Sequence, residues 1–377
     1  MIPDKAFLEI LQDLGIEFFT GVPDSLLKHV CACIYDHVED DQQVITANEG
    51  AAVALAAGYH LATGKIPLVY MQNSGLGNSI NPLLSLADPE VYSIPMLLLI
   101  GWRGEPGVHD EPQHIKQGRV QNGLLDTMGI PFEIIGPDSH NYAEVARNLI
   151  QKAELEKRPV ALVIRQGTFE PYSQNEDEQG NHTLTRKEAL EILVHSLDDQ
   201  DIVVSTTGML SREIFEIRAA SQMGHHRDFL TVGSMGHCSQ IALGIALKNR
   251  SRNTYCFDGD GSILMHMGSL AITGIYAPQN FRHVVINNGA HDSVGGQPTV
   301  GFAIDISAIA TACGYRESRR TDDRTGLIES LDWLRNTAGP VLLEVRVQKG
   351  AQKDLGRPTR KPVENKMDFM KYVKAGE

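Results

Sequence analysis

The sequence predicts an α/β protein made of two doubly wound parallel-sheet domains. Apolar runs of strand length alternate with amphipathic helical segments along almost all of its 377 residues, as in parallel α/β proteins. A polar, acidic stretch, FEPYSQNEDEQGNHT, separates two such series and reads as a linker. The two series end alike, each with a helix followed by a similar strand, RPVALVIR and GPVLLEVRV. We therefore expect domains at 1–168 and 186–377, joined by a linker at 169–185.

The expected elements follow this division. The first domain begins with an amphipathic helix, MIPDKAFLEILQD, and has helices at 24–38 and 49–63. Its strands are expected at EFFTGV, QVITA, PLVYMQ, PMLLLIG, PFEIIG and PVALVIR. The second domain begins with a helix at 185–197, and a short peripheral helix is expected after Gly350. Its strands are expected at DIVVSTTG, DFLTVGS, TYCFDGD, RHVVINN and PVLLEVRV.

Composition restricts the class of partner. Hydrophobic residues make up 42% and charged residues 21%, which is typical of soluble globular domains, and the net charge of -13 argues against a nucleic-acid partner. An anionic substrate would therefore need a local basic pocket. The longest apolar run is too short to span a membrane, and the acidic N-terminal segment does not resemble a signal peptide. We expect a cytoplasmic protein whose five cysteines are buried thiols: Cys31, Cys33, Cys238, Cys256 and Cys313.

The strongest chemical signal is the segment FDGDGS, residues 257–262, at the end of an expected strand. A second strand ends at Asn287 and Asn288, about one helix and one strand further along. In a doubly wound sheet, both segments reach the carboxyl edge, where ligands bind. Taken alone, either piece could be a glycine turn or an unrelated asparagine pair.

Together the two pieces suit a diphosphate held by a metal. Gly259 and Gly261 let backbone N–H groups approach a diphosphate, and Ser262 brings a hydroxyl to the start of the following helix. Asp260 and the amide oxygen of Asn288 are hard ligands suited to Mg²⁺, which keeps diphosphate and water as its other ligands.

A GDG followed by NN at this distance resembles the thiamine-diphosphate-dependent enzymes. The resemblance implies that Asp260, Asn288 and the backbone carbonyl of Ala290 hold the metal. The spacing is one residue longer than in many members, which leaves open whether Asn287 or Asn288 is the ligand.

Three further segments carry the same resemblance. TANEGAAVALAAGYHLATGK implies that Glu49 hydrogen-bonds the aminopyrimidine ring and is catalytic, and GSMGHCSQIALG implies that Met235 supports the bent cofactor. TTGMLSREI implies diphosphate contacts, and a homodimer or larger assembly with active sites at the subunit interface is also implied. The implied cofactor contacts are Glu49, Thr207, Gly208, Ser234, Met235, Gly259, Asp260, Gly261, Ser262 and Asn288.

Larger members, such as acetolactate synthases and pyruvate decarboxylases, insert a middle domain, for which this linker is too short. The whole chain resembles the phosphonopyruvate decarboxylases, with the sulfopyruvate decarboxylases next. The segments that carry this likeness are GVPDSLLKHV, NSGLGNSINPLLSLAD, GWRGEPGVHDEPQHIKQG and NNGAHDSVGGQPT. The resemblance implies decarboxylation of 3-phosphonopyruvate to phosphonoacetaldehyde and CO₂, within phosphonate biosynthesis. Sulfopyruvate decarboxylation and a non-catalytic, regulatory cofactor binder are the alternatives, and retention of Glu49 argues against the second.

A glycine- and proline-punctuated segment at 101–118 offers donors for a small anionic 2-oxo acid. We expect it to be a loop after a strand, where substrate groups often bind, although acidic residues within it also fit a solvated loop. The candidate substrate-binding residues are Arg103, His109, His114 and Lys116 in this segment, together with Ser25, Asn73 and Ser293 elsewhere.

Overall fold

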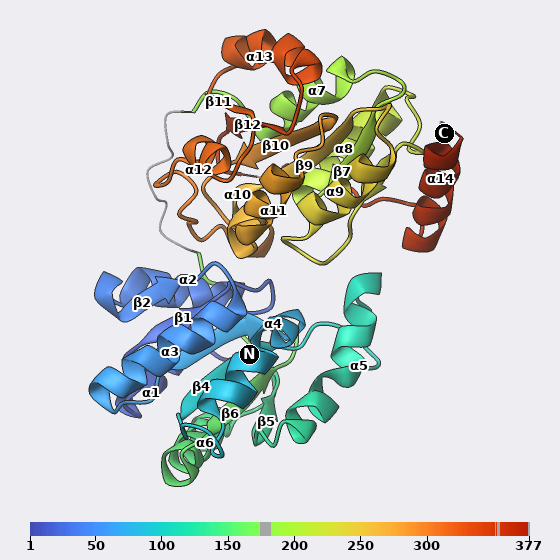
Figure 1. Cartoon of the computed structure of the whole chain (residues 1–377). Helices are drawn as coiled ribbons and strands as arrows, with labels where there is room; N and C mark the ends of the chain where they lie inside the picture. The colour runs from blue at the N-terminus through green and yellow to red at the C-terminus, as the bar shows by residue number, and fades with distance from the viewer. Residues whose placement is uncertain (174–181, 351, 353–354, 376–377) are drawn as a thin grey trace. The chain divides into compact units, whose positions relative to one another are not determined.

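The computed structural model describes residues 1–173, 182–350, 352 and 355–375. The chain divides into two compact units, 1–176 and 177–377. Each unit contains one six-stranded sheet whose paired strands are all parallel (Figure 1). The predicted fold class, two doubly wound domains without a middle domain, is confirmed. Residues 174–181 of the predicted linker lie outside the described residues.

The first unit carries its six strands in the order β2-β1-β3-β4-β6-β5. The strands are β1 (Phe19–Gly21), β2 (Gln43–Ile45), β3 (Leu68–Gln72), β4 (Met96–Gly101), β5 (Phe132–Ile135) and β6 (Pro159–Ile164). The helices are α1 (Asp4–Asp13), α2 (Lys28–His37), η1 (Asp40–Gln42), α3 (Glu49–Thr63), η2 (Asn73–Gly75), α4 (Leu76–Pro82), η3 (Leu83–Ala87), α5 (Pro112–Thr127) and α6 (Tyr142–Glu156).

The second unit has the strand order β11-β12-β10-β9-β7-β8. The strands are β7 (Ile202–Ser205), β8 (Asp228–Leu230), β9 (Thr254–Gly259), β10 (Phe281–Asn287), β11 (Glu317–Thr321) and β12 (Val341–Arg346). The helices are α7 (Arg186–Ser196), α8 (Met209–Ala220), α9 (Cys238–Lys248), α10 (Asp260–Met265), α11 (Gly268–Tyr276), η4 (Asp292–Val294), α12 (Ile306–Ala312), α13 (Arg324–Asn336) and α14 (Pro362–Lys374).

Helices cover both faces of each sheet, so each unit has two hydrophobic cores, one on each face of its sheet. In β3, Leu68 and Tyr70 belong to one buried cluster, whereas Val69 and Met71 belong to another. The strands of the second unit divide in the same way between two clusters. Because successive side chains of a strand point to opposite faces, a strand buried on both faces is apolar throughout. This explains why the strands were recognisable as continuous apolar runs.

Local capping sets where the predicted helices begin. The side chain of Asn48 accepts from the N–H of Ala51 and starts α3, and Thr185 forms a capping box with Glu188 at α7. The helix predicted at 24–38 begins only at Lys28, because the carboxylate of Asp24 accepts from the N–H groups of Leu26 and Leu27 and holds a turn there.

Two expectations about local structure are wrong. The loop predicted over 101–118 ends at Glu111, because Pro112 is the first residue of α5, a position where proline is favoured. His114 and Lys116 therefore lie on a helix. The strand β11 was not predicted, because its sequence ESRRT is polar; it pairs only with β12 at the edge of the sheet.

The expectation of five buried thiols holds for four of the cysteines. All five cysteines are free thiols, four of them buried, and Cys313 is only half-buried. Among the described residues, no helix is long and apolar enough to cross a membrane. The C-terminal helix α14 lies against β8, where Phe369 is buried beside Phe229.

Candidate active site

In the first unit, the candidate residues follow the carboxyl ends of four strands that are neighbours in the sheet. Ser25 follows β1, Glu49 follows β2, Asn73 follows β3 and Arg103 follows β4. Parallel strands bring these ends to one edge, which is the ligand-binding edge of such sheets. The strand order thus gathers residues from four separate segments of the sequence.

Glu49 is the first residue of α3, and its side chain is buried. The amide nitrogen of Asn78 donates to its Oε2 atom at 2.8 Å. A Cβ atom at Gly75 would lie 2.5 Å from the Glu49 side chain, so only glycine leaves room for this carboxyl group. Asn78 and Gly75 belong to the segment after β3, and the sequence interpretation did not identify either as a partner of Glu49.

Arg103 is bound within its own unit. Its guanidinium forms a two-point ion pair with Asp110 and donates from NH1 to the Oγ of Ser25 at 2.6 Å. Asn73 donates to the backbone carbonyl of Arg103 at 2.8 Å. The predicted group of Ser25, Asn73 and Arg103 is therefore brought together. The charge of Arg103 is already balanced by Asp110, one of the acidic residues of the same segment.

Burial shifts the pKa values of two neighbours of Arg103, Asp24 and His114. Burial raises the pKa of Asp24 to about 6, although the charge of Arg103 opposes this shift. Burial lowers the pKa of His114 to about 4, and the charge of Arg103 lowers it further, so His114 is neutral at neutral pH. His109 and Lys116 are exposed, and among the described residues Lys116 has no hydrogen-bond or ion-pair partner.

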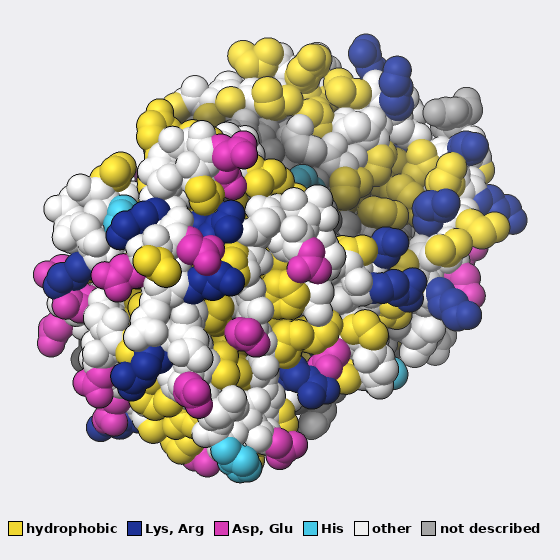
Figure 2. All heavy atoms as spheres, turned by 90° about the horizontal axis from the view of Figure 1, so that it is seen from below, with side chains coloured by type: hydrophobic (Ala, Val, Ile, Leu, Met, Phe, Trp, Pro, Cys, Tyr) yellow, Lys and Arg dark blue, Asp and Glu magenta, His cyan; other side chains and the backbone are white. Residues whose placement is uncertain are grey.

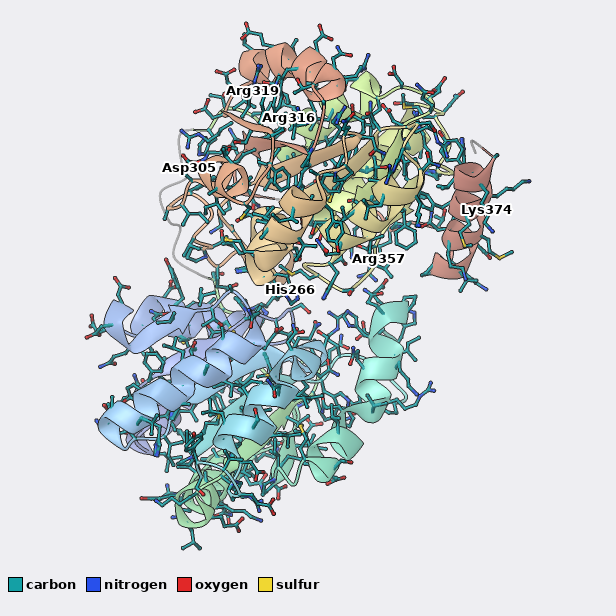
Figure 3. All side chains as sticks on the ribbon, in the orientation of Figure 1. His266, Asp305, Arg316, Arg319, Arg357 and Lys374 are labelled. Atoms are coloured by element: carbon teal, nitrogen blue, oxygen red, sulfur yellow. The ribbon has the colours of Figure 1, made fainter. Side chains whose placement is uncertain are left out.

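The second unit repeats the arrangement at the carboxyl ends of β7 to β10, which are neighbours in its sheet. Thr207 and Gly208 follow β7, and Ser234 and Met235 follow β8. The remaining predicted contacts lie at the ends of β9 and β10: Gly259, Asp260, Gly261, Ser262, Asn288 and Ala290. Figure 3 shows the side chains of this unit, including His266 at the end of α10, whose ring lies against Gly236.

Asp260 and Asn288 are both buried and adjacent. Burial raises the pKa of Asp260 to about 6, whereas hydrogen bonds from Thr299 and from the backbone N–H groups of Asp260, Gly261 and Asn288 oppose the shift. A cation beside this carboxylate would favour its charged form. A buried acid next to an amide oxygen is a donor set that fits Mg²⁺.

The two asparagines at the end of β10 differ in their contacts. Asn287 is fully buried, and its amide nitrogen donates both to Gly301 O and to Glu344 Oε1, each at 2.8 Å. Its carbonyl oxygen accepts from the N–H of Gly289 at 3.1 Å. The carbonyl oxygen of Asn288 has only a longer contact, 3.3 Å from the N–H of Ala290. Asn288 is therefore the asparagine with an available oxygen.

Ser262 connects the three segments predicted to contact the diphosphate. Its hydroxyl accepts from the N–H of Gly236 at 3.0 Å and lies 2.9 Å from the hydroxyl of Thr206. This connecting role of Thr206 was not predicted. Gly208 has φ +96°, and a Cβ there would meet only Ser293, at 3.9 Å, so the backbone at Gly208 is open to a ligand.

Met235 lies over the GDG turn. A Cβ at Gly261 would be 3.3 Å from the Met235 methyl group and 3.2 Å from the ring of His291. Burial lowers the pKa of His291 to about 4, so this ring is neutral at neutral pH. The glycine turn, the apolar methyl group and the buried acid together fit a metal diphosphate joined to an apolar ring.

This site belongs to a thiamine-diphosphate-dependent enzyme. Family models for the N-terminal and C-terminal thiamine pyrophosphate binding domains of thiamine pyrophosphate enzymes match residues 3–130 and 206–345. The chain belongs to the family of thiamine-diphosphate-dependent 2-oxo acid decarboxylases and is a homologue of the phosphonopyruvate decarboxylases. The predicted family, cofactor class and type of enzyme are thereby confirmed.

Three relatives support this assignment along nearly the whole chain. A phosphonopyruvate decarboxylase of Streptomyces viridochromogenes is 36% identical over 96% of this chain and 93% of its own length. Another, of Streptomyces hygroscopicus, is 35% identical over 99% of this chain and 94% of its own length. A sulfopyruvate decarboxylase of Methanosarcina acetivorans is 28% identical over 87% of each chain.

Proposed function

We propose that this decarboxylase acts on 3-phosphonopyruvate and releases phosphonoacetaldehyde and CO₂, within phosphonate biosynthesis. The observation that carries the proposal is the near full-length similarity to two phosphonopyruvate decarboxylases. Sulfopyruvate is the second candidate substrate, because a single-chain sulfopyruvate decarboxylase is also similar over most of the chain.

A substrate panel tests the proposal directly. CO₂ release is measured with phosphonopyruvate, sulfopyruvate and pyruvate under the same conditions, and the phosphonoacetaldehyde formed from phosphonopyruvate is identified by ³¹P NMR. We expect the highest kcat/KM with phosphonopyruvate. A higher kcat/KM with sulfopyruvate would favour the second candidate, and a preference for pyruvate would rule out both.

The proposed roles of the residues follow from their positions. Asp260, the side-chain oxygen of Asn288 and the carbonyl of Ala290 would hold Mg²⁺. The diphosphate would be lined by Gly208, Gly261 and Ser262, together with Thr207, Ser234 and Gly259. Met235 would support the bent cofactor. Thiamine diphosphate, when bound, supplies the carbanion that adds to the 2-oxo group and the ring that accepts the electrons released with CO₂. Glu49, placed by Asn78 and Gly75, would move the proton at the aminopyrimidine ring.

The anionic end of the substrate is proposed to bind near Arg103, with Lys116 and the neighbouring residues His109, His114, Ser25 and Asn73. Arg103 has the forked geometry that suits a phosphonate, although Asp110 occupies this fork. A substrate anion must therefore displace or share Asp110, whereas Lys116 is available without such competition. Ser293, at the other unit's site, lies beside Gly208 and is a further candidate.

Replacing Arg103 or Lys116 by alanine is expected to raise KM for phosphonopyruvate with little change in cofactor affinity. Losing one charged hydrogen bond costs about 1.5–3 kcal/mol, which corresponds to about tenfold to a hundredfold in kcat/KM. Steady-state kinetics with phosphonopyruvate and pyruvate measure the effect. Pyruvate lacks the phosphonate, so it should be a poor substrate whose kcat/KM changes little in either variant.

Lys152→Ala is the matched control, because Lys152 is an exposed lysine of α6 in the same unit. Thermal melting of Arg103→Ala shows whether the loss of the Asp110 pair unfolds the segment. If both variants keep wild-type kcat/KM, the anion site lies elsewhere. The next candidate is then Lys349, whose Nζ lies 3.7 Å from the Cβ position of Gly296.

We further propose a homodimer or larger assembly whose active sites lie between subunits. Two helices support an interface, because each is apolar on more than one side. In α3, Leu61 is 72% exposed, and in α11, Ile275 is 80% exposed and lies beside the exposed Tyr276. On the face drawn in Figure 2, hydrophobic side chains form yellow groups between the charged ones.

Mixing two inactive variants, Glu49→Gln and Asp260→Ala, is expected to restore part of the activity. If each site takes Glu49 from one subunit and Asp260 from the next, an exchanged dimer contains one site with both residues intact. CO₂ release is measured after subunit exchange, which mass spectrometry of differently labelled chains verifies. No recovery despite verified exchange would place both residues of a site in one chain.

A further inference from the structure

A buried network beside the proposed metal ligands is not explained by cofactor binding alone. It centres on Asp292, in η4, four residues after Asn288. One oxygen of Asp292, Oδ2, accepts from Asn288 Nδ2 at 2.6 Å, from Arg186 NH1 at 3.0 Å and from the N–H of Gly350 at 3.1 Å. Three segments far apart in the sequence thus meet at one carboxylate oxygen.

The network is almost closed to water and carries excess negative charge. Arg186 also forms two hydrogen bonds with Glu213, at 2.8 and 3.1 Å, and the side chains of Arg186, Glu213 and Asp292 are 7%, 3% and 8% exposed. Burial alone would lower the pKa of Arg186, but Glu213 and Asp292 raise it, so the arginine stays charged. One arginine therefore faces two carboxylates in this network.

The contact between Asp292 and Asn288 determines which way the amide points. A side-chain amide has one carbonyl oxygen and one NH₂ group on the same carbon. When Asp292 holds the NH₂ group of Asn288, the carbonyl oxygen must point away from Asp292. The backbone N–H of Asn288 contributes to the hydrogen bonding of Asp260, so the two proposed ligands are neighbours.

We propose that Asp292 is a positioning residue of the metal centre, which fixes the amide of Asn288 so that its carbonyl oxygen is presented to the metal. Arg186 holds Asp292 in place, and Glu213 in turn holds Arg186. The proposal rests on the proposed metal site at Asp260 and Asn288. Partners that orient a ligand in this way typically change metal affinity about tenfold to a hundredfold when they are removed.

The test is a titration of the metal-free enzyme with Mn²⁺, followed by electron paramagnetic resonance at saturating thiamine diphosphate, which reports binding without relying on turnover. Asp292→Ala is expected to weaken Mn²⁺ binding about tenfold to a hundredfold, and excess Mn²⁺ should restore the holoenzyme. Asp292→Asn keeps the shape and an acceptor oxygen, so its loss should be smaller. This variant also serves as the test if the alanine variant does not fold.

Two comparisons separate the effect of orienting the Asn288 amide from the effects of lost charge and of lost protein stability. Glu213→Gln removes one charge from the same network without contacting Asn288, and should weaken Mn²⁺ binding less than Asp292→Ala does. In an Asn288→Ala background, Asp292→Ala should add little, because its effect passes through Asn288.

Three results would each overturn the proposal. The first is an equal loss of Mn²⁺ affinity in Glu213→Gln and Asp292→Ala, and the second is wild-type Mn²⁺ affinity in Asp292→Ala. The third is a fully additive loss of affinity in the variant that combines Asn288→Ala with Asp292→Ala. Absence of Mn²⁺ binding to the wild-type enzyme would instead refute the metal site itself, so the two failures are distinguishable.

Discussion

Glu49→Gln is expected to bind thiamine diphosphate and to lose nearly all decarboxylation. Glutamine keeps the shape of the side chain, and its carbonyl oxygen can still accept from Asn78 within the space that Gly75 leaves. It cannot, however, exchange a proton with the aminopyrimidine ring. Proton transfer by a positioned side chain contributes about a hundredfold to ten-thousandfold, and kcat should fall by that amount.

The decisive measurement is the exchange of the C2 proton of the bound cofactor in deuterated solvent, stopped by an acid quench and followed by NMR. This exchange should slow together with kcat, while the cofactor dissociation constant changes little. Glu154→Gln is the matched control, because Glu154 is an exposed glutamate on α6. A wild-type exchange rate in Glu49→Gln would show that another group moves the proton.

Asp260→Ala is expected to abolish formation of the holoenzyme. Asp260 is the only carboxylate among the three proposed ligands, and it is 3% exposed at the end of β9. Removing it leaves only neutral oxygens, which bind Mg²⁺ weakly, and the diphosphate then lacks its counter-ion. The variant should release no CO₂ at any practical concentration of metal and cofactor.

Metal content, measured after chelation, dialysis and reloading, checks this result together with activity. Circular dichroism checks that the metal-free variant is folded, because the alanine side chain removes the hydrogen bonds that Thr299 and three backbone N–H groups donate to Asp260. Full activity of the chelated and dialysed variant would contradict the assignment of Asp260 to the metal.

Much of the fold could be predicted because it depends on local patterns. Continuous apolar runs identify strands buried on both faces, and α3 was predicted over its full length, because Asn48 caps its start and Gly64 ends it. The polar edge strand β11 could not be recognised, since half of it faces solvent and its stabilisation comes from pairing with β12. Pro112 was interpreted as part of a loop, although proline also begins helices.

In the candidate site, too, the sequence predicted what lies in adjacent residues but not the contacts between distant segments. The GDG turn and the asparagine pair were recognisable because their chemistry lies in adjacent residues. The contacts of Glu49 with Asn78, and of Arg103 with Ser25, join segments that only the parallel sheet brings together. No periodicity in the sequence predicts them. The number of charges in the 101–118 segment likewise did not show that Asp110 neutralises Arg103.

The two sheets share one topology. When the strands of each unit are numbered from its own first strand, both sheets have the same order, 2-1-3-4-6-5. Equivalent positions carry different residues: the helix after the second strand begins with Glu49 in the first unit and follows Met235 in the second. After the third strand come Asn73 and Asp260, respectively. The same sheet edge therefore carries different proposed chemistry in the two units: proton transfer at Glu49 in the first, and metal and phosphate binding at Asp260 in the second.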